Sequence, residues 1–157
     1  MTYEEFVVAE QQRLLGLAHA LTGNPHDAWD LTQETLVRVA ERWRRIDDAR
    51  PYARQVMVRL NVDRIRRRRR ERPVDETPDA AVEPVLVGDV DPWLVEALAT
   101  LSPQQRTALA LRFVEDLDTR TIAERLGCSE GTARSHLSRG TERLRHHARQ
   151  REQEPNR

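Results

Sequence analysis

The feature that most constrains the fold of this chain is a three-residue break between two helical patterns. In residues 118–126 and 130–145, apolar positions recur at intervals of three and four, the period of an α-helix with one buried face. Between them, Gly127 can adopt the left-handed conformation that ends a helix. The Ser129 hydroxyl can accept a hydrogen bond from a free amide of the next helix. The pattern predicts a helix-turn-helix.

The second helix of such a motif can lie in the major groove of DNA, where its side chains reach the base edges. In this chain its outward face carries polar residues: Arg134, Ser135, Ser138 and Arg139. The alternative is a plain pair of packed helices whose outer face contacts only solvent. The arginines and serines on this face favour DNA binding over that alternative.

Charge is unevenly distributed along the 157 residues, although the net charge is zero. Residues 1–72 carry 15 arginines and 11 acidic residues, residues 73–92 carry 6 acidic residues and no basic one, and residues 93–157 carry 11 arginines and 9 acidic residues. All 26 basic residues are arginine, whose planar cation suits phosphate and guanine, although a GC-rich genome also favours arginine. Two basic segments therefore flank an acidic one.

The first basic segment is predicted to form three helices, over residues 2–23, 24–43 and from near Pro51 onward. The third ends in five consecutive arginines, Arg66 to Arg70, which repel one another and are typical of a chain that binds a polyanion. A nucleic-acid partner is favoured over the alternative that these arginines only increase solubility. A membrane surface is disfavoured, because the apolar face of this helix is expected to pack in a three-helix core.

The second of these helices has an acidic face. Its acidic residues lie three, four and seven positions apart, beside Gln33: Asp27, Asp30, Glu34 and Glu41. Acidic residues near the start of a helix complement the helix dipole and are common on solvated faces. Taken alone, this face is ordinary.

Residues 73–91 are predicted to form a flexible acidic linker, because they contain three prolines, one glycine, six acidic residues and no basic residue. Fully extended, they can span at most ~65 Å. Signals that begin helices occur on both sides of this segment: Thr2, Asn24-Pro25, Asp91-Pro92, Ser102 and Asp118. We therefore predict an all-α fold of two small helical domains, residues 1–72 and 92–148, with a polar tail over residues 149–157.

Three details of the second domain follow from the same patterns. Ser102 and Gln105 have the spacing of a capping box. The core of the helix that follows is expected to contain Leu109, Phe113 and Val114. Residues from His146 onward are polar and are expected to fray.

Several classes of site are not expected. The single cysteine, Cys128, excludes an internal disulfide and a multi-cysteine zinc site. The five histidines do not combine with cysteines or carboxylates at metal-ligand spacing, and no phosphate loop or nucleophile motif occurs, so we expect no metal, no cofactor and no enzymatic activity. No apolar run approaches the ~18 residues that span a membrane, and the N-terminus is acidic. These features predict a cytoplasmic protein without membrane insertion.

Several stretches resemble one protein family. Residues 27–34, DAWDLTQE, are similar to the motif D-A-x-D-L-x-Q-E, and residues 63–70 are similar to the arginine-rich end of a DNA-contacting helix. The similar stretches of the C-terminal half are residues 101–106, 111–113, 122–127 and 131–135. Over nearly its whole length the chain resembles the extracytoplasmic-function sigma factors of bacterial RNA polymerase.

This resemblance implies a sigma2-like three-helix bundle and a sigma4-like helix-turn-helix domain, in a monomer that binds core RNA polymerase and promoter DNA. The residues that it assigns to core polymerase are Asp27, Asp30, Gln33 and Glu34. Those that it assigns to the −10 element are Tyr52, Arg59, Asp63, Arg64, Arg66 and Arg67. Those that it assigns to the −35 element are Ser129, Thr132, Arg134, Ser135, His136, Ser138 and Arg139. An anti-sigma protein is a further partner that the resemblance suggests.

Four residues depart from the usual pattern of the family. Arg59 stands where asparagine is common and Asn61 where a small residue is usual, so the preferred −10 bases stay open. His136 stands where arginine is frequent in the recognition helix. Trp29 occupies a position that is more often acidic, which adds an apolar group to the expected docking surface.

Other interpretations of the same residues stay open. Tyr52 either stacks on an unpaired base or belongs to the core. A regulator that uses only the helix-turn-helix would leave the face of Asp30, Gln33 and Glu34 unexplained. A sigma-like decoy that binds only an anti-sigma protein would not need the arginine run from Arg66 to Arg70.

Overall fold

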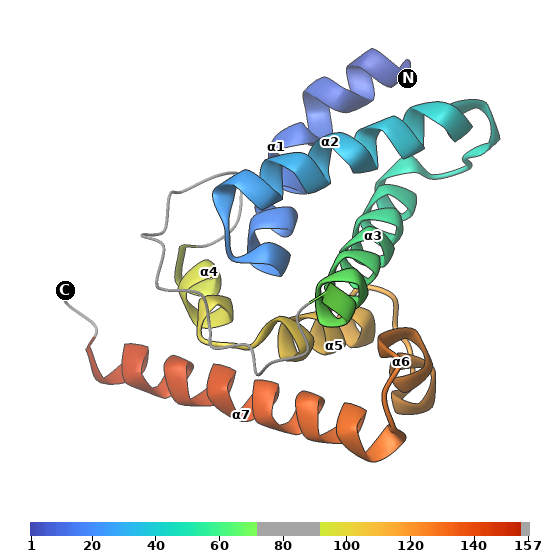
Figure 1. Ribbon diagram of the computed structural model, residues 1–157. Helices are drawn as coiled ribbons and strands as arrows, with labels where there is room; N and C mark the ends of the chain where they lie inside the picture. Colours follow the sequence, from blue (N-terminus) through green and yellow to red (C-terminus); the bar gives the residue numbers. More distant parts are fainter. Residues whose placement is uncertain (72–91, 155–157) are drawn as a thin grey trace.

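The computed structural model describes residues 1–71 and 92–154, and every regular element within them is helical. In order these are α1 (Tyr3–Thr22), α2 (Pro25–Arg42), the short 3-10 helix η1 (Trp43–Arg45), α3 (Ala49–Glu71), α4 (Pro92–Ala99), α5 (Pro103–Phe113), α6 (Thr119–Leu126) and α7 (Glu130–Gln153) (Figure 1). The all-α prediction is confirmed. Among the described residues, none of the helices has the length and apolar character needed to cross a membrane.

Local side-chain chemistry sets the ends of these helices, largely where the sequence predicts. Five N-caps accept hydrogen bonds from backbone amides: Thr2, Asn24, Ser102, Asp118 and Ser129. Gly23 ends α1 and Gly127 ends α6, both with the positive φ that glycine adopts without strain. The predicted capping box of Ser102 and Gln105 is present. Asp91, predicted to begin α4, lies outside the described residues.

Helices α1, α2 and α3 form the first half of the molecule around a core that includes Phe6, Leu31 and Met57, each at most 1% exposed. A polar contact also joins two of these helices. The Tyr3 hydroxyl donates to the carbonyl oxygen of Leu36 at 2.9 Å, which joins α1 to α2. The three-helix bundle predicted for this half is present.

Helices α6 and α7 form the helix-turn-helix, α5 packs against both of them, and α4 lies against the later turns of α7. Gly140 allows α5 and α7 to cross closely, because a Cβ atom at this position would lie 2.9 Å from Cδ1 of Leu109. The Trp93 ring of α4 lies 5.8 Å from the His147 ring, and the Arg151 guanidinium lies 5.5 Å from the centre of the Trp93 ring. These contacts extend the packing of α7 far beyond the recognition residues.

Two expectations for this half are wrong. Residues 146–153 were expected to fray, but they continue α7, and its last turns pack against Trp93. Phe113 is 77% exposed and not part of the core. The buried face of α5 runs instead through Ala108, Leu109 and Leu111.

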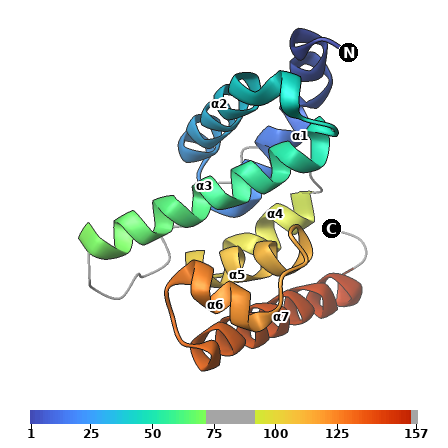
Figure 2. The same ribbon diagram turned by 90° about the vertical axis from the view of Figure 1, so that its right-hand side faces the viewer.

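The two halves pack against each other. One continuous group of buried apolar side chains includes Leu14 and Val58 of the first half and Leu111 and Ile122 of the second. Figure 2 shows α3 between the other helices of the first half and the second half. Two helices of the first half therefore meet the second half: α3, which ends in the arginine run, packs against α5 and α6, and α1 packs against α4 and α5. The predicted linker, residues 73–91, lies outside the described residues.

Candidate functional site

The acidic face of α2 is partly exposed to solvent. Asn24 Oδ1 accepts hydrogen bonds from the amides of His26 at 2.9 Å and Asp27 at 3.2 Å, which fixes the first turn of the helix. Asp30 is exposed, and Gln33 and Glu34 are half-buried on the same side. The structure therefore brings together the four residues assigned to core polymerase.

Two exposed apolar side chains lie along this face. Trp29 is 49% exposed and Val37 is 56% exposed, and with Gln33 between them they are spaced four residues apart on α2. The sequence predicted an exposed apolar group at Trp29 but gave no signal for Val37. The face thus combines carboxylates with apolar area, which suits a protein partner better than a nucleic acid.

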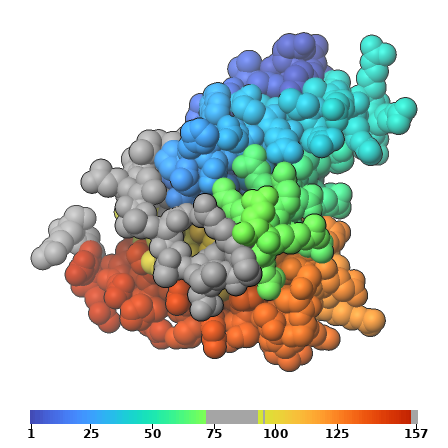
Figure 3. All heavy atoms as spheres, in the orientation of Figure 1, coloured from blue at the N-terminus to red at the C-terminus, as the bar shows by residue number. Residues whose placement is uncertain are grey.

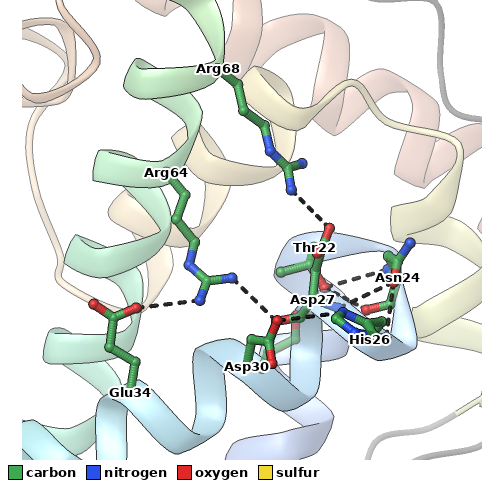
Figure 4. Close-up of polar contacts among 9 residues, drawn as sticks. Thr22, Asn24, His26, Asp27, Asp30, Glu34, Arg64 and Arg68 are labelled. Atoms are coloured by element: carbon green, nitrogen blue, oxygen red, sulfur yellow. Dashed lines mark hydrogen bonds and ion pairs between the residues drawn. The ribbon is translucent and has the colours of Figure 1, made fainter.

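Arginines of α3 hold the acidic face in place. A guanidinium nitrogen of Arg64 lies 3.3 Å from Glu34 Oε2, and another donates to the carbonyl oxygen of Asp27 at 3.4 Å (Figure 4). Arg68 pairs with the Asp27 carboxylate at 3.0 Å. The Arg64 side chain is only 20% exposed. Arg64 was assigned to the −10 element, and the structure places its side chain against the acidic face of α2. Arg68 was not singled out from the sequence.

His26, Asp27 and Asp30 form the one group within residues 1–71 and 92–154 whose ligand atoms come close enough to hold a metal, all within 4.8 Å. His26 Nδ1 lies 3.4 Å from Asp30 Oδ2. Asp27 already has Arg68 as its partner, and His26 and Asp30 are exposed. These contacts orient the first turn of α2, and we assign the group no metal.

The remaining residues assigned to the −10 element are distributed along α3. Asp63, Arg66 and Arg67 are exposed. Tyr52 is half-buried and packs against the apolar core, as the alternative interpretation expected. Arg59 lies 3.4 Å from Glu115 of the second half. The structure thus places three of these six side chains in solvent and gives Arg59, Arg64 and Tyr52 contacts within the protein.

A hollow of about 480 Å³ lies beside the start of α3. Its lining combines apolar, aromatic and charged side chains: Met1, Phe6, Trp43, Ile46, Asp47, Asp48, Ala49 and Arg50. These residues come from the start of α1 and from the segment between α2 and α3. Sequence patterns gave no signal for this hollow because its two walls are far apart along the chain.

Helix α7, the predicted recognition helix, presents a largely exposed polar face. Thr132, Arg134, Ser138 and Arg139 are exposed, and Ser135 is half-buried. Arg134 pairs loosely with Glu130 at 3.7 Å, one helical turn earlier. The Ser129 hydroxyl accepts from the Thr132 amide at 3.1 Å and donates to the Thr132 hydroxyl at 2.9 Å, so it is used in capping α7.

Two polar residues of the helix-turn-helix face the arginine run of α3. Burial lowers the pKa of His136, and the positive charges of Arg69 and Arg139 lower it further. Burial raises the pKa of the Cys128 thiol, an effect that Arg69 partly offsets. His136 therefore favours its neutral form, and Cys128 keeps its proton. His136, a predicted −35 residue, therefore lies within electrostatic reach of Arg69 in the first half.

Comparison with known proteins fits this geometry. Residues 6–71 match the family model for Sigma-70 region 2, and residues 92–144 match the model for Sigma-70, region 4. The chain is also 38% identical to an RNA polymerase sigma-E factor of Streptomyces avermitilis, over 92% of this chain and 84% of the relative. The chain belongs to the extracytoplasmic-function sigma factors. The resemblance inferred from the sequence motifs is confirmed.

Other relatives of this sigma factor belong to the same family. An RNA polymerase sigma-E factor of Streptomyces coelicolor is 35% identical over 92% of this chain and 85% of the relative. The ECF RNA polymerase sigma factor SigE of Mycolicibacterium smegmatis is 33% identical over 92% of this chain and 60% of the relative. Among solved structures, the sigma factor RpoE of Bartonella quintana, in complex with the anti-sigma factor NepR, matches with a TM-score of 0.59 and 23% identity, over 94% of this chain and 96% of that one. This last likeness shows the shared fold.

Proposed function

We propose that this sigma factor binds core RNA polymerase through α2 and directs it to promoters that α3 and α7 recognise. In this proposal Asp27, Asp30, Gln33 and Glu34 form the docking face for polymerase. Helix α3 contacts the −10 element, and α7 enters the major groove at the −35 element. The protein selects the start site and carries out no covalent chemistry, and it works in the cytoplasm with the polymerase.

The observation that carries the proposal is the presence of two different exposed polar faces on one chain. The face of α2 is acidic with apolar additions at Trp29 and Val37, which suits a protein partner. The face of α7 offers the exposed arginines Arg134 and Arg139 at the start of a recognition helix, which suits DNA. A regulator that binds only DNA has no use for the first face.

The arginines supply two kinds of contact with promoter DNA. A bidentate arginine–guanine pair is worth about 1–3 kcal/mol of discrimination against a wrong base, and we assign this role to Arg134 and Arg139. Phosphate contacts add affinity that falls as salt rises, and we assign them to Arg66 and Arg67. Arg64 has a different role, because its side chain supports the docking face through Glu34.

An anti-sigma protein is a further proposed partner. The Bartonella quintana sigma factor of similar fold is in complex with an anti-sigma factor, and the likeness extends over both halves of the present chain. A protein that covers the acidic face of α2 would compete with core polymerase for the same residues.

Run-off transcription with purified core polymerase and this protein tests the proposal. The templates are a library of promoter fragments, and those that are transcribed are identified by sequencing. Promoter-dependent transcripts that require both proteins are expected. A regulator confined to the helix-turn-helix predicts no such transcripts and no co-purification with core polymerase. A decoy that binds only an anti-sigma protein also predicts no transcripts.

A further inference from the structure

Helix α7 continues far past the residues that were assigned to the −35 element. It is one continuous helix from Glu130 to Gln153, whereas those residues end at Arg139. At 1.5 Å per residue, residues 140–153 add ~21 Å of helix. In the space-filling view, α7 forms the lower edge of the molecule along its length (Figure 3). The proposed contacts with the −35 element therefore leave the later turns of α7 without a role.

One side of these later turns is held by the rest of the second half. A guanidinium nitrogen of Arg143 donates to the carbonyl oxygen of Thr100 at 2.7 Å. The ring of His147 and the guanidinium of Arg151 both lie against the Trp93 ring of α4. Because Arg143, His147 and Arg151 are spaced four residues apart, they share one side of α7. That side faces the protein, which leaves the opposite side for a partner.

The opposite side carries arginines in line with a reading residue. Arg145 follows Arg134 by about three turns of helix, so the two side chains project from the same side of α7. Arg149 lies one turn further along, and both Arg145 and Arg149 are exposed. Within the part of the chain that the structure describes, Arg145 makes no hydrogen bond or ion pair. When Arg134 faces DNA, Arg145 and Arg149 face it too.

The distance along α7 indicates which part of the DNA these arginines reach. At 1.5 Å per residue, Arg145 lies ~17 Å beyond Arg134. The major groove is only about 12 Å wide. A straight helix whose first turns lie in the groove has therefore left it at Arg145 and lies over the neighbouring sugar–phosphate backbone. Arginine forms strong charge-assisted hydrogen bonds with phosphate, and such contacts add affinity without reading the sequence.

The composition of this side favours DNA over a protein partner. The large apolar side chains exposed within residues 1–71 and 92–154 are Met1, Val8, Trp29, Val37 and Phe113, and α7 contributes none of them. The centre of a protein interface is enriched in apolar and aromatic residues. A basic surface without such residues is better suited to a polyanion.

Two acidic residues also lie on this side, Glu142 and, at the far end of the helix, Glu152. Glu142 pairs with Arg149 at 3.2 Å, and both side chains are more than half exposed. An exposed ion pair contributes only about 0–1 kcal/mol, so a phosphate can replace Glu142 as the partner of Arg149. Glu142 therefore weakens the contact of Arg149 with DNA without preventing it.

We propose that Arg145 and Arg149 form a second DNA contact, with backbone phosphates just outside the −35 element. This proposal rests on the function proposed above and extends it. The first turns of α7 select the sequence, and the exposed side of its later turns holds the flanking backbone whatever its sequence is. Arg145 supplies most of this contact, because Arg149 is partly neutralised by Glu142.

Promoter binding by the holoenzyme over a series of salt concentrations tests this contact. Each lost phosphate contact lowers the slope of log affinity against log salt by about 0.9. Arg145→Ala should lower the slope by about this amount, weaken binding several-fold on all promoter variants alike, and leave the −35 preference unchanged. Arg145→Lys keeps the charge and should keep a slope close to that of wild type.

Arg151→Ala is the matched control, because it removes the same charge from the same helix on the side that faces Trp93. It should keep the wild-type slope, and thermal unfolding confirms that each variant is folded. Glu142→Gln frees Arg149 and should strengthen promoter binding a few-fold. A misfolded protein cannot produce such a gain.

Neutral linkages in the DNA locate the same contact. At ~3.4 Å per base pair, ~17 Å of helix corresponds to about five base pairs. Uncharged methylphosphonate linkages are therefore placed within about five base pairs of the −35 element, first on one flank and then on the other. On one flank they should weaken binding of wild type several-fold and binding of Arg145→Ala hardly at all.

The outcomes separate this proposal from the function on which it rests. Folded Arg145→Ala with the wild-type salt slope, or an equal response of both proteins to the neutral linkages, would overturn the phosphate contact. This side of α7 would then be solvated or bind an acidic protein, and a −35 preference of the holoenzyme would still support the proposed function. A holoenzyme without any −35 preference would overturn both.

Discussion

The docking face of α2 and the reading face of α7 are both exposed and polar, but the protein holds them differently. Asp27 and Glu34 of α2 are paired with Arg68 and Arg64, which come from another helix at 3.0 and 3.3 Å. On α7, the contact of Arg134 is with its own helix, at 3.7 Å. Asp27 and Glu34 are thus fixed by tertiary contacts, whereas Arg134 keeps more of its rotamer freedom.

This difference affects how much side-chain entropy each face loses when a partner binds. A side chain that tertiary contacts already hold loses little entropy when a partner arrives, whereas a long exposed side chain loses about 0.5–1.5 kcal/mol when it is immobilised. The face of α2 is therefore suited to one constant partner. The face of α7 can adjust to bases and phosphates, and its contacts contribute mainly selectivity.

The largest expected effect is on the reading face. Arg134→Ala should reduce discrimination at one −35 position by about 1–3 kcal/mol, since it removes an arginine that can pair with guanine. Fold stability should hardly change, because the side chain is 68% exposed. Competition binding of promoter variants by holoenzyme measures the change. Arg145→Ala, an exposed arginine two turns beyond the reading face, is the control. An unchanged −35 preference in Arg134→Ala would remove α7 from the proposed reading role.

A smaller effect is expected from a residue that is on α3 but supports α2. Arg64→Ala should weaken binding to core polymerase about tenfold, because Glu34 and the first turn of α2 lose the group that orients them. A hydrogen bond to a charged group is worth about 1.5–3 kcal/mol. The value is lower here, because both partners are partly exposed. Titration of labelled protein with core polymerase measures the affinity.

Arg67→Ala is the matched variant for this test, because Arg67 is an exposed arginine of the same helix. It should weaken promoter binding and leave core affinity close to that of wild type. If Arg64→Ala and Arg67→Ala behave alike in both assays, Arg64 does not position the docking face, and the contrast between α2 and α7 loses its main support.

The helix ends and the two polar faces could be predicted from the sequence because both depend on local information. A capping hydroxyl such as that of Ser129 contacts an amide three residues away, and the face of α7 follows from the helical period. Motif similarity then placed α2 and α7 in a known family. The helical period also placed Asp27, Asp30 and Glu34 correctly on one side of α2, and their role in docking stays a prediction.

The contacts between distant segments could not be predicted in this way. Arg68 and Asp27 are 41 residues apart and Asn61 and Thr107 are 46 apart, and no local pattern indicates either pair. The arginine run predicted a polyanion partner for α3, but one side of that helix is used inside the protein. Phe113 lies four residues after the buried Leu109, the spacing of a core residue, and is nevertheless 77% exposed, which no local pattern indicates.

The smallest expected effect is a dependence of folding stability on pH, which arises at His136 of α7. Burial and the charges of Arg69 and Arg139 lower the pKa of His136 below its ordinary 6.5, so below that pH the unfolded chain binds the proton more readily than the folded protein. The contribution of His136 to the free energy of unfolding should therefore be fully present above about pH 6.5 and decrease as the pH falls below it. Buried His19, whose pKa is also lowered by burial, contributes in the same direction.

His136→Gln should reduce the slope of unfolding free energy against pH below about 6.5, where denaturant titrations measure it. His146→Gln, at an exposed position of the same helix, is the control and should keep the wild-type slope. A wild-type slope in His136→Gln would mean that His136 is solvated in solution. Arg69 of α3 would then not lie over the recognition helix, and the reading face of α7 would be free of the first half.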